Sequence, residues 1–282
     1  MEELDDKWRI KRTGLLPAYQ VDFTQPIWQL RFDDVADLVG VECRDADLLK
    51  TSFSVFERTT GKLLLDNYNA SAGWWASLAD IRTSILFLQG LNPAGLGKHS
   101  GLMAINVNTG ALRWQHEQYS FYNLTANQLL VLPNNLESAE LIGLNIGTGA
   151  VVGIAGSIAQ AQVPVEELKA QRLKTLQLPL HYGLESRYFA TLSQFIYQKI
   201  GLKAAFALDY LETETCFAIG YYPETDNPAK QYWLALFSIA GELLLHEELG
   251  KELTGIGPDN FFIFRDTLIL IKYKKSLVAY KV

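Results

Sequence analysis

The sequence predicts an all-β protein, a β-propeller of about six four-stranded blades. Two observations predict it: a strand–turn–strand unit that recurs every forty to fifty residues, and C-terminal strands that stop one strand short of a blade. The hydrophobic content of 49%, with 14 Phe and 13 Tyr, excludes global disorder. A period in the forties with several strands per unit is that of propeller blades. Closed all-β folds often reach this length as one domain, so residues 1–282 are expected to form a single propeller domain.

The two ends of the chain are expected to share the closing blade. Residues 18–23 and 27–32 form predicted strands around a Thr-Gln-Pro turn, and the C-terminus forms strands at 261–264, 268–273 and 277–282. An N-terminal strand then supplies the fourth strand, which removes exposed sheet edges. The count becomes seven blades if the N-terminal pair forms its own unit.

The repeated unit is an apolar strand, a tight turn ending in glycine and a second strand, the pattern of a β-hairpin. The clearest copy spans residues 101–114, where the turn glycine meets a requirement for positive φ. Weaker copies span residues 53–65, 141–152 and 233–245. The turn glycines are Gly61, Gly110, Gly149 and Gly241, separated by 49, 39 and 92 residues. The longest gap leaves room for one degenerate copy, with Gly201 as its candidate turn glycine.

One segment departs from the strand pattern. Residues 163–176 place Val165, Leu168 and Leu173 near helical spacing, with Pro164 close to the start, as suits a helix N-terminus. The sequence therefore predicts one short inserted helix. It either packs on a neighbouring blade or docks a partner.

The copy at residues 101–114 resembles the repeat of quinoprotein-type (PQQ-like) β-propellers, commonly Ala-x-Asp-x-x-Thr-Gly-x-x-x-Trp. Ala104, Thr109, Gly110 and Trp114 match it, and Asn106 replaces the aspartate. The resemblance implies that Trp114 docks one blade onto the next. Quinone-dependent enzymes of that family are typically exported, and many carry adjacent cysteines and an acidic metal site. The sequence shows no export signal and no adjacent cysteines, and the resemblance carries over no catalytic residue.

In length and repeat degeneracy the chain is also similar to uncharacterised bacterial propeller-like proteins of unknown function, with an architecture like that of WD40 and YVTN propellers. No cofactor is expected. The net charge of −6 and the dispersed basic residues argue against nucleic acid as a partner. No apolar run is long enough to cross a membrane, and no export signal is visible. Cys43 and Cys216 belong to no CxxC motif, which favours free thiols and a cytoplasmic location.

Two places are candidates for ligand or partner contacts. The glycine-rich loop at residues 90–100 fails the Walker spacing, but Lys98 and His99 within it are candidates because long loops often carry function. The pair Trp74 and Trp75 is expected to pack between sheets. If the pair lies on a strand, one indole is exposed and available to stack on a sugar or a partner.

The remaining polar residues give no recognisable site. The histidines lack the close spacing of a zinc site, and two of them, in the pairs His116-Glu117 and His246-Glu247, are expected on a solvated outer strand. A cluster of acidic residues lacks the spacing of a calcium loop and is expected to be a solubilising loop. Its members are Asp33, Asp34, Asp37, Asp45 and Asp47.

The predicted function is that of a non-catalytic binding or scaffold propeller, with another protein as its partner. The alternative is an enzyme of hydrolase or oxidoreductase type, whose site is assembled from several blades at the central channel. A metal-binding cluster in the channel favours the enzyme, and a plugged channel favours the scaffold. The sequence leaves the ligand and the oligomeric state open.

Overall fold

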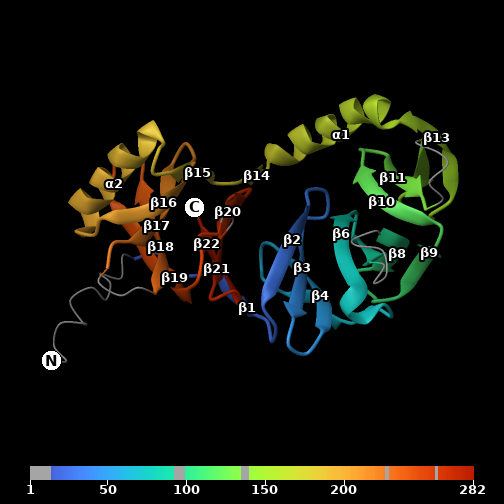
Figure 1. Ribbon diagram of the computed structural model, residues 1–282, viewed down its shortest axis with the longest axis horizontal. Helices are drawn as coiled ribbons and strands as arrows, with labels where there is room; N and C mark the ends of the chain where they lie inside the picture. The colour runs from blue at the N-terminus through green and yellow to red at the C-terminus, as the bar shows by residue number, and fades with distance from the viewer. Residues whose placement is uncertain (1–13, 92–98, 135–139, 226–228, 258–259) are drawn as a thin grey trace. The chain divides into compact units, whose positions relative to one another are not determined.

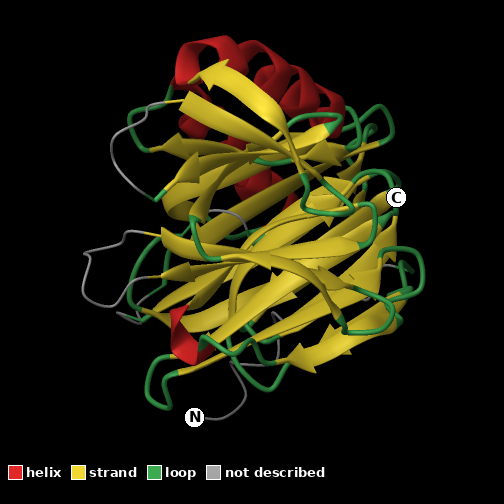
Figure 2. Ribbon diagram, turned by 90° about the vertical axis from the view of Figure 1, so that its right-hand side faces the viewer, coloured by secondary structure: helices red, strands yellow, loops and turns green. Residues whose placement is uncertain are grey.

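The computed structural model describes residues 14–91, 99–134, 140–225, 229–257 and 260–282 (Figure 1). Its regular structure is antiparallel strand with two α-helices and one short 3-10 turn, so the all-β class is confirmed (Figure 2). The chain divides into two compact units. We call Phe23–Thr175 the internal unit, and Met1–Asp22 together with Leu176–Val282 the terminal unit. The single-domain assignment stays a prediction.

The internal unit contains three four-stranded sheets, each formed by strands consecutive in sequence. The first sheet consists of β2 (Ile27–Asp33), β3 (Leu38–Asp45), β4 (Lys50–Glu57) and β5 (Leu63–Tyr68). The second follows a 3-10 turn, η1 (Gly73–Trp75), and consists of β6 (Ala76–Arg82), β7 (Ile85–Leu91), β8 (His99–Asn106) and β9 (Leu112–His116). The third consists of β10 (Tyr119–Leu124), β11 (Gln128–Pro133), β12 (Glu140–Asn145) and β13 (Val151–Ser157).

Both faces of the middle sheet are buried, which explains why its strands read as continuous apolar runs. On β7, Leu86 and Leu88 pack toward the β2–β5 sheet, and Ile85 and Phe87 pack toward the β10–β13 sheet. Successive side chains of a strand point to opposite faces, so one strand serves two cores. The three sheets therefore form a stack of blade-like layers.

Helix α1 (Ile158–Leu173) covers the β10–β13 sheet at the end of this stack (Figure 1). Its Ala161 and Val165 pack on Leu130 and Leu141 of that sheet. The helix begins at a capping box formed by Ser157 and Gln160. The predicted helix at 163–176 is thus present, but it begins earlier and ends earlier. Pro164 lies inside the helix and not near its start.

The terminal unit contains two five-stranded sheets. One consists of β15 (Leu180–Gly183), β16 (Ala204–Glu212), β17 (Cys216–Pro223), β18 (Lys230–Ser238) and β19 (Leu243–Leu253). The other has the order β1 (Tyr19–Asp22), β22 (Ser276–Lys281), β21 (Thr267–Lys272), β20 (Phe261–Phe264) and β14 (Leu176–Gln177). Strand β1 pairs with β22, so the two ends of the chain share a sheet as predicted.

Helix α2 (Arg187–Ile200) covers the β15–β19 sheet on the face opposite the β20–β22 sheet (Figure 1). Ile196 is fully buried against Phe237, and Phe195 packs on the same aromatic cluster. This helix was not predicted from the sequence, and the prediction of a blade turn at Gly201 is wrong. Gly201 instead ends α2 in a left-handed conformation, with φ 86°.

The segment between the helices adds an extra strand to each sheet of the terminal unit. Strand β14 pairs with β20, and β15 pairs with β16. β20 and β16 are the first strands of their four-stranded repeats. The chain's own residues 176–183 thus cover both of these edges.

The four predicted blade-turn glycines all adopt positive φ, between 69° and 80°. In the clearest turn, the Asn106 side-chain oxygen accepts hydrogen bonds from the backbone N–H groups of Asn108 and Thr109, and Gly110 N–H donates to the Asn106 carbonyl. Asn145 makes the same bonds in the turn that ends at Gly149. Gly61 N–H bonds in the same way to the Glu57 carbonyl, whereas Gly241 ends a turn one residue shorter, with its N–H bonded to the Ser238 carbonyl.

Other sequence predictions need correction. The described residues form five sheets of four or five strands, so the prediction of six or seven four-stranded blades is not confirmed. The strands expected at 18–23 and 27–32 are present as β1 and β2 but belong to different sheets. Cys43 and Cys216 are free thiols, as expected, and both are buried. Among the described residues, no helix has both the length and the apolar content that a bilayer crossing requires.

Candidate functional site

The most unusual surface lies at one end of the β2–β5 sheet. Trp28 stands near the start of β2, the β3–β4 turn carries Leu48 and Leu49, and η1 carries Trp74 and Trp75. The strand register places the start of β2 and the β3–β4 turn at the same end of the sheet, because Cys43 pairs with both Ile27 and Ser52. Arg44 and Thr51 donate hydrogen bonds to the Trp74 carbonyl, which brings η1 to this end. We call these five residues the Trp28–Trp75 surface.

Arg44 organises this surface. Its guanidinium carbon lies 4.9 Å from the ring centre of Trp74 and 5.8 Å from that of Trp28. Its Nη1 and Nη2 donate to the carbonyls of Trp74 and Ala76 at 3.0 and 2.6 Å, and its Nε donates to Glu42. The arginine therefore fixes η1 onto β3 and holds two indole rings beside one planar cation.

The Glu42 carboxylate beneath the surface is fully occupied by hydrogen-bond donors. Glu42 is fully buried and accepts hydrogen bonds from Arg44, from Gln29 Nε2 at 2.7 Å and from the Leu78 backbone N–H at 2.6 Å. Gln29 Nε2 also donates to the Leu78 carbonyl. Because these polar groups bind one another, what the surface offers outward is largely apolar.

The exposed fractions are large for apolar residues: 68% for Trp28, 61% for Leu48, 61% for Leu49 and 43% for Trp75. Trp74 is partly buried against Arg44. Single exposed apolar residues are ordinary, whereas a group of them beside exposed tryptophan is typical of an interaction site. The sequence analysis expected Trp74 and Trp75 to pack between sheets from a strand; they lie instead on a 3-10 turn.

Leu49 also holds a strained backbone conformation, with φ 48°. Its turn repeats the blade-turn geometry, because Asp45 accepts hydrogen bonds from the N–H groups of Asp47 and Leu48 as Asn106 does in its own turn. Leu49 occupies the left-handed position that glycine holds in the four repeat copies. A non-glycine residue costs about 1 kcal/mol or more there, and such outliers cluster at functional sites.

The rest of the acidic cluster is structural. Asp33 accepts from Val35 and Ala36 in another turn of the same kind, and Asp37 binds Arg58 at 2.7 Å. Among the described residues, no group of three or more His, Cys, Asp or Glu side chains is arranged to hold a metal ion. These carboxylates build turns and ion pairs, which corrects the expectation of a solubilising loop.

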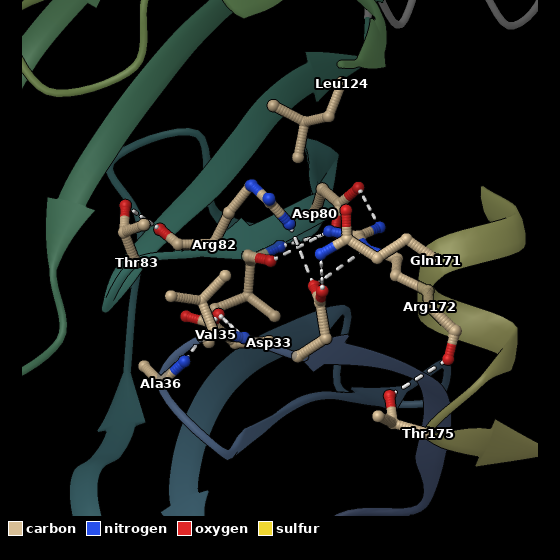
Figure 3. A network of polar contacts seen from close by, with 12 residues as sticks. Asp33, Val35, Ala36, Asp80, Arg82, Thr83, Leu124, Gln171, Arg172 and Thr175 are labelled. Atoms are coloured by element: carbon tan, nitrogen blue, oxygen red, sulfur yellow. Dashed lines mark hydrogen bonds and ion pairs between the residues drawn. The ribbon is translucent and has the colours of Figure 1, made fainter. Parts of the chain in front are cut away.

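A buried charge network lies between α1 and the inner strands of the internal unit (Figure 3). Arg172 of α1 donates to both oxygens of Asp80 at 2.9 and 3.1 Å, and its Nε lies 3.4 Å from Asp34. Arg82 binds Asp34 at 2.8 Å. Two arginines thus neutralise the two carboxylates, and the network anchors the helix.

The terminal unit contains a second constellation, which the sequence analysis missed. Asp209 is 1% exposed, and its two oxygens have separate partners: His181 Nδ1 lies 2.7 Å from Oδ1, and the Tyr232 hydroxyl donates to Oδ2. Gly220 makes room for that tyrosine, because a Cβ there would lie 2.0 Å from its hydroxyl oxygen. When Nδ1 carries the proton, the half-exposed His181 has its Nε2 lone pair available, the arrangement of a histidine general base.

The other candidate residues have structural surroundings. Trp114 Nε1 donates to the Ile146 carbonyl at 3.2 Å, and His116 Nε2 lies 2.8 Å from the Gly149 carbonyl, so both contact the turn of the following sheet. His246 is buried beside the Tyr221 hydroxyl, at 2.8 Å, which corrects its expected place on a solvated strand. Lys98 lies outside the described residues, and His99 begins β8, where its side chain is not described.

Comparisons with known proteins bear on the fold only. Residues 32–114 match the model of a family described as a domain of unknown function (DUF4905). No curated protein matches the chain.

The solved structures that match include three propellers. The Dos1 propeller is 8% identical, with a TM-score of 0.40 over 95% of this chain and 95% of that one. The β-propeller domain of the Trilobed protease from Pyrococcus furiosus is 8% identical, with a TM-score of 0.32 over 89% and 64%. The WD40 domain of SCAP from fission yeast is 11% identical, with a TM-score of 0.29 over 97% and 59%. The chain thus spans less than two thirds of the last two.

Proposed function

We propose that this protein is a non-catalytic binding propeller that docks another protein through the Trp28–Trp75 surface. The observation that carries the proposal is the exposure of two tryptophans and two leucines above polar groups that are already paired with one another. Tryptophan is enriched among the residues that dominate interface energies, and leucine adds apolar area around it.

The strain at Leu49 supports the same proposal. Folding alone favours glycine in that left-handed position, as in the other blade turns. A leucine there lowers stability and leaves an apolar side chain in water. A function that uses the side chain accounts for its presence, since binding surfaces often hold such locally costly residues.

The experiment is quantitative affinity capture with three baits: the unaltered chain, the double variant Trp28→Ala/Trp75→Ala, and Leu112→Ala as a control. Leu112 is exposed on β9, away from the surface. We expect one protein to be retained by the unaltered chain and the control and lost by the double variant. Once that protein is purified, Trp28→Ala and Trp75→Ala should each raise its dissociation constant by about 30-fold. Equal capture by all three baits would contradict the proposal.

A hydrolase is the second candidate, favoured by the His181–Asp209 pair. A histidine held by a buried carboxylate acts as a general base toward a hydroxyl or a water molecule. Hydrolysis of activated acyl esters by the purified chain tests it, with His181→Gln and Asp209→Asn as variants. The enzyme proposal requires measurable turnover that both variants lose while their folds persist. Turnover equal to that of free imidazole would exclude it.

The coverage of two strand edges in the terminal unit supports binding over catalysis. Residues 176–183 cover the first-strand edges of both sheets in the terminal unit. In the internal unit, the two carboxylates nearest α1 are bound by arginines. The strand edges and the two carboxylates already bind residues of their own chain, which supports a non-catalytic binding or scaffold function.

We also propose that the strand–turn–strand repeat is of the quinoprotein type. It is supported by the shared turn geometry of Asn106 and Asn145 and by Trp114, which donates its hydrogen bond across to the next sheet. The buried thiols of Cys43 and Cys216 support a reducing compartment such as the cytoplasm.

A further inference from the structure

The buried tyrosine Tyr221 has a base as the partner of its hydroxyl group. Its side chain lies on β17 and is 0% exposed, and its oxygen lies 2.8 Å from Nε2 of His246 on β19. In the described part of the chain the hydroxyl has no other partner, so the phenol donates and Nε2 accepts. The two rings are parallel within 2°, with their centres 6.2 Å apart. The phenol is therefore aligned to give its proton to the imidazole.

Burial keeps both groups in the protonation states that such a transfer needs. It raises the pKa of the Tyr221 phenol, which stays protonated, and it lowers the pKa of His246 to about 4, so the imidazole is neutral at neutral pH. A tyrosine that loses an electron becomes a strong acid, so even a weak base takes its proton. Because the hydroxyl is enclosed, that proton goes to His246 and not directly to water.

Trp233 connects this pair to the surface. It lies opposite Tyr221 in the ladder between β17 and β18, and its ring centre is 4.8 Å from that of His246. Side chains opposite each other in an antiparallel pair have Cβ atoms about 5 Å apart, which brings two aromatic rings into contact. The indole is only partly buried, whereas the phenol is fully enclosed. An electron can thus leave the buried tyrosine through a tryptophan that reaches the surface.

Two neighbouring buried tyrosines show what is particular to Tyr221. The Tyr222 hydroxyl bonds with the carbonyl and the N–H of Gly257, neither of which takes up a proton. The Tyr232 hydroxyl donates to a buried carboxylate. Both rings belong to the core on the other face of the sheet, whereas Tyr221 and Trp233 share the face that α2 covers. Of these three tyrosines, Tyr221 alone combines a basic partner with a tryptophan on the same face.

We infer that Tyr221, His246 and Trp233 form a one-electron redox site, which takes one oxidising equivalent from a soluble radical oxidant and holds it as a tyrosyl radical. The oxidant removes one electron from the exposed part of the Trp233 indole and is itself reduced. An electron from Tyr221 then refills the indole radical cation, and the phenol O–H bond breaks as its proton passes to His246 Nε2. The products are the reduced oxidant, a neutral tyrosyl radical and an imidazolium. The inference does not depend on the Trp28–Trp75 surface.

The test is flash photolysis of the full chain with tris(bipyridine)ruthenium(II) and a cobalt(III) ammine as sacrificial acceptor, which generates a one-electron oxidant in solution. Exposed tyrosyl radicals couple with one another during a delay before freezing, so a radical that persists is an enclosed one. We expect electron paramagnetic resonance to show a persistent tyrosyl radical in the unaltered chain. Tyr221→Phe should lose it, whereas Tyr222→Phe, the matched control on the same strand, should keep it. Thermal unfolding checks that each variant is folded.

Two further variants test the proton acceptor and the path of the electron. His246→Gln can still accept a hydrogen bond from the phenol but is not a base. In transient absorption the radical should therefore form about a hundredfold more slowly, the lower end of what a positioned general base contributes. Trp233→Phe should slow its formation to a comparable extent, because phenylalanine is much harder to oxidise than tryptophan.

Four outcomes would overturn the inference. The first is the absence of a persistent radical in the unaltered chain, and the second is its survival in Tyr221→Phe. The third is its loss in Tyr232→Phe, which would assign the radical to the tyrosine on the other face of the sheet. The fourth is an unchanged rate of formation in both His246→Gln and Trp233→Phe, since the tyrosine would then need neither the base nor the tryptophan.

Discussion

At the scale of single residues, the left-handed position of the blade turn shows how local geometry and packing combine. Gly110 and Gly149 occupy this position with nearly the same φ, 69° and 70°. Their surroundings differ: a Cβ at Gly110 would lie 3.5 Å from a leucine methyl, and one at Gly149 would lie 2.6 Å from the Trp114 ring. The pair therefore separates the cost of backbone strain from the cost of the blade contact.

We predict that Gly149→Ala lowers the free energy of unfolding more than Gly110→Ala does. Both variants lose about 1 kcal/mol through the left-handed conformation. Only Gly149→Ala also displaces a rigid indole, which adds about 1–3 kcal/mol by overpacking. Urea denaturation of the two variants measures the difference. Equal losses would mean that Trp114 does not press on this turn.

Substitution of Leu49 should change the free energy of unfolding in the opposite direction. Leu49→Gly should raise the free energy of unfolding by about 1 kcal/mol, because glycine adopts the left-handed conformation without steric cost. Leu48→Gly is the matched control: Leu48 is equally exposed but is not left-handed, so this variant should be neutral or slightly destabilising. Thermal unfolding compares them. A loss of stability in Leu49→Gly would show that the leucine contributes to the fold.

His246 is predicted to make stability depend on pH. Burial lowers its pKa from 6.5 to about 4. Between those values the unfolded chain binds a proton that the folded chain does not, so stability rises with pH and is lost as pH falls from about 6.5 to about 4. The loss reaches at most about 3 kcal/mol.

Comparing the unaltered chain with His246→Gln by urea denaturation across this pH range isolates the effect from that of the carboxylates. The variant should show a shallower slope. Parallel slopes would place His246 in contact with water in the folded state.

Residue positions were the hardest to predict from sequence. Glycine and asparagine in the blade turns carry a local signal, so Gly61, Gly110, Gly149 and Gly241 were predictable. The His181–Asp209 pair carries none, because the two residues lie 28 positions apart and meet only through the pairing of β15 with β16. Trp28 gave no signal either, since exposure at a strand end has no periodicity.

At the scale of elements, each helix covers the terminal sheet of its unit. The α2 helix was predictable in principle: Phe189, Leu192, Ile196 and Ile200 follow the helical period, Ser186 caps the start and Gly201 ends it. Gly201 also lies where a fifth blade turn was expected, and a glycine there is compatible with either a turn or a helix end. For α1 the apolar spacing indicated the helix, but the predicted start at residue 163 was five residues too late, because tertiary packing overrides the preference of proline for the first turn.

The buried network should determine how firmly α1 is held. Arg172→Met removes both hydrogen bonds to Asp80 and leaves a buried carboxylate without its cation, so we expect a loss of about 3 kcal/mol in the free energy of unfolding. Lys169→Met is the control: it removes an exposed pair with Glu166 on the same helix and should cost less than about 0.5 kcal/mol. Similar losses in chemical denaturation would mean that the network adds nothing to the exposed pair.

At the scale of the whole molecule, the repeat period predicted stacked antiparallel sheets, and the structure has them. The repeat period did not predict the number of sheets, because the segment before Gly201, expected to be a degenerate copy of the repeat, is helix α2. The extra strands β14 and β15 had no sequence signal, since two to four residues are too few to show alternation. The pairing of the two chain ends was predictable because the last three strands lacked a fourth.

The pairing of β1 with β22 has a consequence for synthesis on the ribosome. Asp22 contacts Ser276, 254 positions later, and translation covers that distance in roughly 13 to 50 seconds. During this interval the internal unit has emerged complete, while the first strand has no partner to pair with. Strand β1 therefore stays without its partner strand until residues 276–281 have also been made, so the sheet that contains it forms only after translation of the internal unit.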